Sequence, residues 1–156
     1  MFREMRRKKQ QLPKEECETL LKTEKRGVLS LLGDEGYPYG IPLDFYYEDG
    51  KIYFHGAKEG HKISAVENCD KASFCVFTVE PPKNGGWINT VKSVIAFGRI
   101  HKVENLDKTI EICRKLSKKF TDDSDYTEKE IAGGKDRVLC LELVCEHITG
   151  KKTEER

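Results

Sequence analysis

Residues 53–62, YFHGAKEGHK, place two histidines, two lysines and two glycines between two apolar runs. The preceding run, KIYF, has the composition of a strand, and the following run, ISAV, can begin a helix. A turn that leads into a helix leaves backbone N–H groups without partners, and these groups attract an anion together with the helix dipole. Gly56 and Gly60 would let the backbone approach such an anion closely. The stretch therefore predicts a phosphate site.

Lys62 gives this interpretation its strongest support. The helix dipole disfavours a cation in the first turn, so the position makes sense when a phosphate lies beside it. Lys58 and His61 add positive charge. A solvent-exposed loop explains the motif alone equally well, because the chain has 28 Lys and Arg residues. A metal site built from His55 and His61 has no supporting carboxylate or cysteine cluster, so no metal site is expected.

Aromatic residues are frequent just before this turn. Most are expected to be core or dimer contacts, as aromatics on strands usually are. A flat ring system attached to a phosphate would nevertheless find both of its partners here. The aromatic residues in question are Tyr37, Tyr39, Phe45, Tyr46, Tyr47, Tyr53 and Phe54.

Size and charge restrict the class of protein. A chain of 156 residues with 37% hydrophobic and 35% charged residues is expected to form one domain, residues 1–156. The net charge of +1 argues against a nucleic-acid binder, although the basic segment 1–11, MFREMRRKKQQ, leaves that alternative testable. This segment lacks the apolar stretch of a secretory signal, and no run is long enough for a membrane helix. We therefore expect a cytoplasmic protein.

The cysteines carry no metal or disulfide signature. The chain has six, and none forms a C-x-x-C pair. Several occupy positions suited to small apolar residues, so we expect reduced, buried thiols. The six are Cys17, Cys69, Cys75, Cys113, Cys140 and Cys145.

Hairpin turns dominate the predicted elements. GDEG at 33–36 and EDG at 48–50 would make a three-stranded meander, and Pro38 and Pro42 would place its middle strand at an edge or a bulge. Gly98 predicts a bend or bulge in the longest strand. Residues 121–135 read as a polar loop plus one helical turn. The expected helices are 13–26, about 60–68 and 107–120, and the expected strands are 28–32, 37–47, 51–56, 71–79, 92–104 and 137–150, followed by a tail, 151–156.

Six strands without βαβ alternation argue against a parallel sheet. The fold class that fits is mainly β (α+β), a small antiparallel six-stranded barrel with peripheral helices.

These residues resemble a known family. The chain combines G-Y-P-Y-x-x-P-L with Y-F-H-G-A-x-x-G-x-K, preceded by an RR pair and followed by KASFCVF, SVIAFGRI and ITGK. This order is similar to that of the 5-nitroimidazole-resistance (Nim) family, a branch of the pyridoxamine-phosphate-oxidase-like flavoproteins. The resemblance runs from about Arg6 to Lys151. It implies a split β-barrel that binds FMN as a homodimer, with two sites at the subunit interface.

The resemblance also implies roles for particular residues. His61 and Lys62 match the basic pair that holds the flavin phosphate, and His55 and Gly56 match the strand end that contacts the phosphate and ribityl chain. Ser93 lies on a strand that approaches the flavin of the partner subunit in such dimers. The residues matching the strand whose backbone runs along the flavin ring are Ile41, Pro42, Leu43 and Asp44.

One position departs from the family pattern. The family often has an aromatic residue two positions before this serine, where this chain has Val91. Trp87 lies just upstream and is either a replacement contact or a loop aromatic packed on the barrel. The substrate pocket therefore does not carry over from the family.

The resemblance favours an FMN-dependent reductase that takes hydride from a nicotinamide and reduces a small acceptor such as a nitroaromatic compound. A non-catalytic flavin or haem binder that acts as a store or redox sensor is the alternative. Pyridoxamine-phosphate oxidation is disfavoured, because the C-terminal strand shows no cluster for a substrate phosphate. No catalytic side chain is assigned, because redox chemistry belongs to the cofactor.

Overall fold

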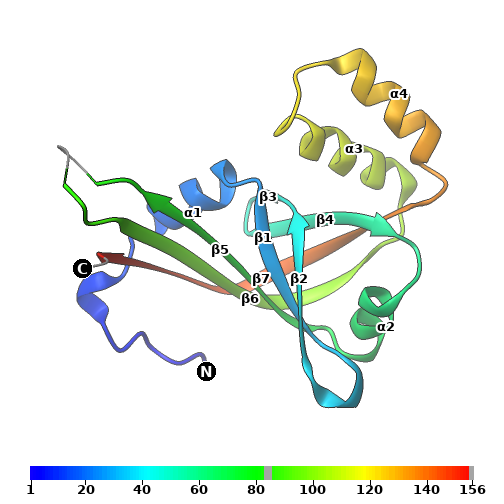
Figure 1. Cartoon of the computed structure of the whole chain (residues 1–156). Helices are drawn as coiled ribbons and strands as arrows, with labels where there is room; N and C mark the ends of the chain where they lie inside the picture. The colour runs from blue at the N-terminus through cyan, green and yellow to red at the C-terminus, as the bar shows by residue number, and fades with distance from the viewer. Residues whose placement is uncertain (83–85, 155–156) are drawn as a thin grey trace.

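The computed structural model describes residues 1–82 and 86–154, which form one antiparallel sheet of seven strands with helices around it (Figure 1). The strand order is β2-β1-β5-β6-β7-β4-β3. The strands are β1 (Arg26–Leu32), β2 (Pro38–Asp44), β3 (Tyr46–Glu48), β4 (Lys51–Ala57), β5 (Lys71–Glu80), β6 (Thr90–Val103) and β7 (Val138–Glu154). The helices are α1 (Lys14–Thr23), α2 (His61–Asn68), α3 (Leu106–Ser117) and α4 (Ser124–Gly134), with short 3₁₀ turns at Lys8–Gln10 and Asp34–Gly36.

The curled sheet encloses the core, as in half of a split barrel. Alternate residues of each strand face inward, because side chains change sides at every position. The rings of Phe45, Phe54 and Phe74 meet at tilted angles in the centre of this core. Leu20 and Leu21 of α1 add to the same cluster. The mainly β, antiparallel fold with peripheral helices is therefore confirmed.

The first three strands do not form the expected meander. β1 pairs with β2, and β3 pairs with β4, but β2 lies at one edge of the sheet and β3 at the other. The predicted strand 37–47 is interrupted at Phe45, whose ring is buried in the core. The two pieces are β2 and β3, so the sheet has seven strands where six were expected. The edge position expected from Pro38 and Pro42 is confirmed.

Two features of the long strands affect the rest of the molecule. The pairing of β6 with β7 shifts register between Phe97 and Gly98, which confirms the expected bulge. β7 continues to Glu154, so most of the predicted C-terminal tail, 151–156, is strand. Residues 155–156 and the loop residues 83–85 lie outside the described residues.

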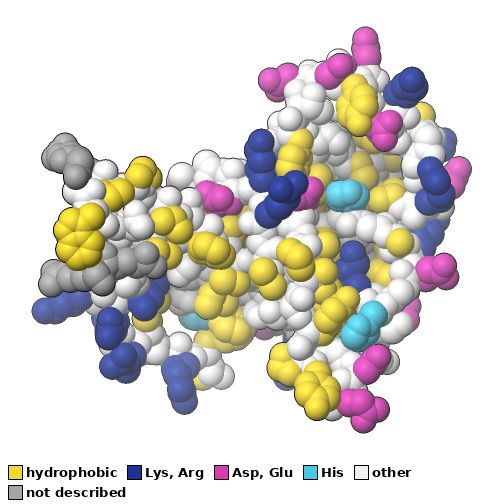
Figure 2. All heavy atoms as spheres, in the orientation of Figure 1, with side chains coloured by type: hydrophobic (Ala, Val, Ile, Leu, Met, Phe, Trp, Pro, Cys, Tyr) yellow, Lys and Arg dark blue, Asp and Glu magenta, His cyan; other side chains and the backbone are white. Residues whose placement is uncertain are grey.

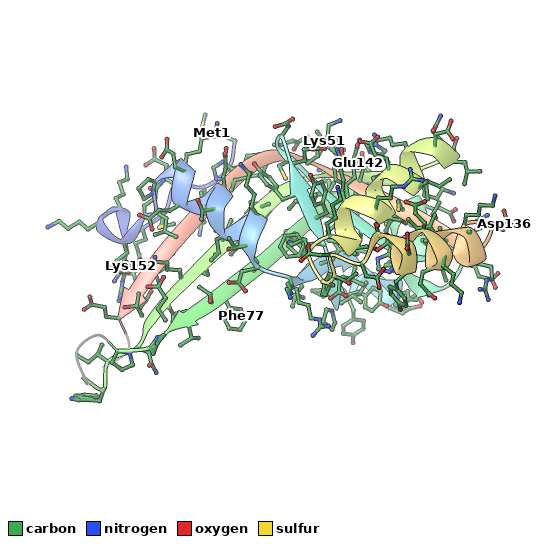
Figure 3. The ribbon with its side chains drawn as sticks, turned by 90° about the horizontal axis from the view of Figure 1, so that it is seen from above. Met1, Lys51, Phe77, Asp136, Glu142 and Lys152 are labelled. Carbon is green, nitrogen blue, oxygen red and sulfur yellow. The ribbon has the colours of Figure 1, made fainter. Side chains whose placement is uncertain are left out.

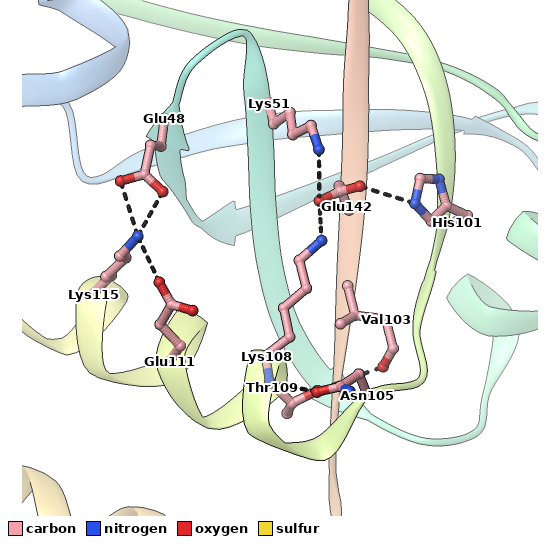
Figure 4. A network of polar contacts seen from close by, with 10 residues as sticks. All are labelled: Glu48, Lys51, His101, Val103, Asn105, Lys108, Thr109, Glu111, Lys115 and Glu142. Atoms are coloured by element: carbon pink, nitrogen blue, oxygen red, sulfur yellow. Dashed lines mark hydrogen bonds and ion pairs between the residues drawn. The ribbon is translucent and has the colours of Figure 1, made fainter.

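α3 docks on the outer face of the sheet through a buried carboxylate (Figure 4). Glu142 of β7 is only 4% exposed and accepts from Lys108 Nζ at 2.6 Å. Lys51 Nζ lies 3.5 Å away, and His101 Nε2 lies 3.0 Å from the other carboxylate oxygen. Burial acts to raise the pKa of Glu142, but hydrogen bonds from Lys108 and Tyr53 and the charges of Lys108 and Lys51 outweigh it and lower the pKa to about 2.

Residues 121–135 form a helix rather than a loop with one turn. Asp123 caps α4 by accepting from the backbone N–H of Tyr126 at 2.9 Å. Thr127 is the one buried residue of this helix. The helix therefore lacks the apolar stripe by which most helices are predicted from sequence. Among the described residues, no helix has the length and apolar character needed to cross a membrane.

Candidate functional site

The turn between β4 and α2 carries the residues predicted to bind a phosphate, and the structure brings only some of them together. Gly60 caps α2 at φ 113°, a backbone conformation that glycine adopts without strain. Ile63 and Val66 of α2 are buried in the core, so the start of this helix is fixed against the sheet. Figure 2 shows Lys, Arg and His side chains on this face, between α3 and α4 above and the β1–β2 hairpin below.

Lys62 extends from α2 back across the end of β4. A Cβ built on Gly56 would lie 2.5 Å from Lys62 Nζ, so the amine occupies the space that the glycine leaves open. Burial lowers the pKa of Lys62. Among the hydrogen bonds and ion pairs of residues 1–82 and 86–154, none involves this amine. A half-buried cation at a helix start without an acidic partner is suited to bind an anion.

His61 contacts a different part of the chain. Its ring stacks on Tyr39 with centroids 4.0 Å apart, and its Nε2 lies 3.6 Å from Asp34 Oδ2. Gly33 permits this approach, because a Cβ there would lie 3.3 Å from His61 Nε2. The tip of the β1–β2 hairpin therefore holds His61. Tyr39 was among the aromatic residues noted in the sequence, but its stacking on His61 and the contribution of Asp34 were not predicted, because each contact joins residues more than 20 positions apart.

His55 and Gly56 point to opposite faces of β4. Gly56 shares the face of Lys62, whereas the His55 ring lines a hollow beneath α3 and α4. Burial lowers the pKa of His55, Asp44 opposes this shift and Lys62 adds to it. Because the residue stays exposed at the rim of the hollow, its desolvation is partial. The charge of Lys62 thus affects the pKa of His55, although the two side chains lie on opposite faces of β4.

β2 offers its backbone at an open sheet edge. β2 also contacts β4, although the two strands are not paired in the sheet. The side chains of Ile41 and Leu43 pack against the core, Pro42 is exposed, and Asp44 accepts from Arg26 Nε at 2.8 Å. The backbone groups of these residues that do not pair with β1 are therefore the part available to a ligand, as the resemblance implies.

Lys119 holds the chain at the end of β2, a role that no pattern in the sequence indicated. Its amine donates to the carbonyl oxygens of Glu24 and Phe45 and lies 4.0 Å from the centre of the Phe45 ring. Burial lowers the pKa of Lys119 to about 8, and Glu24 and Asp44 oppose the shift. The amine thereby joins α1 to the end of β2.

Ser93 lies away from the other predicted residues. It is on the outer face of β6, opposite Phe77 of β5 and Lys151 of β7. Ile100, whose N–H donates to Asp70 just after α2, is seven positions further along the same strand, or roughly 20 Å. Within one chain, Ser93 therefore lies far from the C-terminal end of α2.

Val91 stands where the family often has an aromatic residue, and Trp87 lies just upstream. Val91 pairs with Val79 and Thr153. Trp87 is 76% exposed, so the expectation that it packs on the barrel is wrong within one chain. Among the described residues, no group of three His, Cys, Asp or Glu side chains is arranged to hold a metal ion.

A family model described as pyridoxamine 5′-phosphate oxidase matches residues 13–152 of the chain. A comparison of the chain with curated proteins found no match. Solved structures share its fold at low sequence identity. A proposed 5-nitroimidazole antibiotic resistance protein from Bacteroides thetaiotaomicron is 18% identical, with a TM-score of 0.75 over 92% of this chain and 87% of that chain.

Two further structures are named for the cofactors they bind. A FAD-binding protein from Mesorhizobium loti is 19% identical, with a TM-score of 0.69 over 92% of this chain and 96% of that chain. A FAD and heme binding protein from Mycobacterium smegmatis is 20% identical, with a TM-score of 0.70 over 91% of this chain and 72% of that chain. At these identities the likeness shows the fold.

Proposed function

The chain belongs to the pyridoxamine 5′-phosphate oxidase family, and from this membership we propose that it is an FMN-binding flavoprotein. We further propose that it reduces small acceptors, such as nitroaromatic compounds, with hydride from a nicotinamide. The names of the similar structures, which include FAD binders and a 5-nitroimidazole resistance protein, support this proposal.

The Lys62 amine over Gly56 is the observation that carries the proposal. The amine is half-buried, has no acidic partner in the described part of the chain, and lies where a glycine leaves space beside a helix start. A phosphate placed there would gain a charge-assisted hydrogen bond and neutralise a cation that burial disfavours. The residues present therefore fit the phosphate of a flavin mononucleotide.

The remaining residues would orient the ring. A bound flavin would supply the electron-transfer chemistry, while the protein supplies orientation and electrostatics. The backbone from Ile41 to Asp44 lies at the open edge of β2, where its groups can hydrogen-bond the edge of a flat heterocycle. Arg26 fixes Asp44 at the end of this strand. His61, held by Tyr39 and Asp34, would lie beside the phosphate.

We propose a homodimer with two flavin sites at its interface. The outer face of β1, β5 and β6 carries apolar side chains that one chain leaves exposed, and Figure 3 shows Phe77 projecting from β5 on the side away from α1. Ser93 lies on the same face, so a second chain could bring it to the flavin. The exposed apolar residues of this face are Val28, Leu32, Phe77, Val79, Ile95 and Phe97.

The remaining parts of the proposal concern the chain as a whole. Residues 1–156 act as one flavin-binding unit. All six cysteines are free, which fits a reducing compartment, so we place the protein in the cytoplasm.

The visible spectrum of the purified protein, followed by identification of the released chromophore, tests the function. FMN is expected, with bleaching by a reduced nicotinamide and recovery on addition of a nitroaromatic acceptor. FAD would overturn the choice of flavin. A Soret band, or a flavin that no nicotinamide reduces, would support the alternative of a haem or flavin binder without catalysis. A colourless protein that takes up neither cofactor would refute the proposal.

A further inference from the structure

A hollow of about 270 Å³ lies between α3, α4 and the outer face of the sheet. Its walls are mainly apolar, with Ile110, Ile131 and Val138 among them. Cys113 of α3 and His55 of β4 also line it. The proposed flavin site uses the opposite face of β4, where Gly56 and Lys62 meet, so it leaves this hollow unexplained.

Cys113 meets a second thiol at the floor of the hollow. Its Sγ lies 4.0 Å from Sγ of Cys140, which has no exposed surface. Cys140 is the direct partner of His55 in the pairing of β4 with β7, and its thiol also lies 3.9 Å from the carbonyl oxygen of Thr109. One thiol of this pair is therefore reachable through the hollow, and the other lies behind it.

We propose that Cys113 and Cys140 form a redox-active pair in which a small hydroperoxide oxidises Cys113 and Cys140 then closes a disulfide. In the first step the Cys113 thiolate attacks one peroxide oxygen, the O–O bond breaks and the alcohol or water leaves with a proton. The sulfur becomes a sulfenic acid, a two-electron oxidation. In the second step the Cys140 sulfur attacks the sulfenic sulfur, the S–O bond breaks and water leaves.

The geometry permits this bond. A disulfide needs its sulfurs about 2.05 Å apart, so each sulfur has to move by roughly 1 Å. Rotation about χ1 of the two cysteines can supply such a movement, because the hollow leaves space on the Cys113 side. The resulting bond would join α3 to β7 directly behind β4.

The surroundings also assign the roles of the two thiols. A hydrogen bond from Cys140 lowers the pKa of Cys113, against the effect of burial, and the same contact together with burial raises that of Cys140. The other titratable groups that line the hollow are His55 on β4, Glu130 on α4 and Lys135 just after α4. The lowered pKa of Cys113 contrasts with three other thiols, Cys17, Cys75 and Cys145, whose pKa values burial raises. Cys113 is thus the attacking thiol and Cys140 the resolving one.

Thiol counting on the full-length protein as purified tests the pair, with or without flavin bound. The protein is freed of reductant, treated with a few equivalents of hydrogen peroxide, denatured and alkylated, and its peptides are mapped by mass spectrometry. Two of the six thiols should disappear and return with dithiothreitol, and the peptides of Cys113 and Cys140 should be linked. Because the test does not use the flavin, a failure here is distinct from a failure of the proposed function.

Three variants sharpen the result. Cys113→Ser should keep all of its remaining thiols, and Cys140→Ser should stop at a sulfenic acid that dimedone traps on Cys113. Cys145→Ser, the control, should still lose two. Retention of six thiols by the wild type, a linkage between other cysteines, or loss of two thiols in Cys113→Ser would overturn the proposal. Mapping of the wild-type chain decides the question even if a variant fails to fold.

Discussion

Lys62 is the residue on which the proposed flavin site depends most. A charge-assisted hydrogen bond to a partly desolvated phosphate contributes about 1.5–3 kcal/mol. Lys62→Ala should therefore weaken FMN binding about tenfold to a hundredfold, because each ~1.4 kcal/mol changes the dissociation constant tenfold. Titration of the apoprotein with FMN, followed by flavin fluorescence, measures the change.

Riboflavin, which lacks the phosphate, provides the decisive control for Lys62. The wild type and Lys62→Ala should bind it with nearly equal affinity. An equal loss for riboflavin and FMN would show that Lys62 does not bind the phosphate. Lys58 is exposed in the same turn, and Lys58→Ala should change FMN affinity by well under ~1 kcal/mol.

Glu142 matters for stability rather than for the ligand. Glu142→Gln leaves Lys108 and Lys51 without their buried counter-charge and should lower the free energy of unfolding by roughly 2–4 kcal/mol at pH 7. Denaturant unfolding measures this difference. The matched control is Glu128→Gln, which breaks an exposed ion pair with Arg114 and should leave the unfolding midpoint almost unchanged.

The effect of Glu142 should depend on pH in one direction. Its pKa in the folded protein is about 2, below the ordinary value of 4.5. A depressed pKa stabilises the folded state at pH values above 4.5, and this contribution is lost as the pH falls towards 2. The difference in unfolding free energy between wild type and Glu142→Gln should shrink over that range. A difference that stays constant down to pH 2 would contradict this account.

At the scale of single elements, the bulge in β6 requires a glycine. A Cβ on Gly98 would overlap the carbonyl oxygen of Val144 in β7, and backbone atoms cannot move aside as a flexible side chain can. Gly98→Ala should therefore lower the free energy of unfolding by roughly 3 kcal/mol. Thermal and denaturant unfolding of the variant test this expectation.

Gly133 of α4 is the matched control for Gly98. A Cβ at this position has nothing within 4 Å, so Gly133→Ala should stabilise the protein by about 0.5–1 kcal/mol through helix propensity. Equal effects of the two substitutions would mean that the contact with Val144 does not determine the requirement at Gly98.

At the scale of the whole molecule, the exposed outer face predicts a dimer. Phe77 is 62% exposed on a face that also carries Ile95 and Ser93. A stable interface of this kind should bury roughly 2,000 Å² in total. Phe77→Glu would place a charge in it, so this variant should sediment as a monomer at micromolar concentration and lose most of its bound FMN.

A second substitution to glutamate controls for surface charge. Tyr126 of α4 is 56% exposed and lies outside the proposed interface, so Tyr126→Glu should remain a dimer with flavin. A wild-type protein that sediments as a monomer with a full complement of flavin would contradict the proposed interfacial site.

Local sequence patterns determined most of the elements. Pro38 and Pro42 have no N–H to donate to a neighbouring strand, so β2 had to be an edge strand or contain a bulge. Gly98 marked the bulge, because a close backbone approach excludes a side chain. The full length of α4, which Asp123 caps, was not predicted, because that helix has a polar composition. Patterns of this kind can be recognised in the sequence because they depend on residues that are neighbours in the chain.

The tertiary structure alone decided which elements meet. Strands β2 and β4 follow similar turns, yet β1, β5, β6 and β7 lie between them in the sheet, an order set by long-range packing. The stacking of His61 on Tyr39 and the approach of Cys113 to Cys140 depend on long-range packing of this kind. The sequence by itself determined the turns, the edge strand and the residue types of the proposed phosphate site. Contacts between distant residues require the curvature of the whole sheet, which no local pattern encodes.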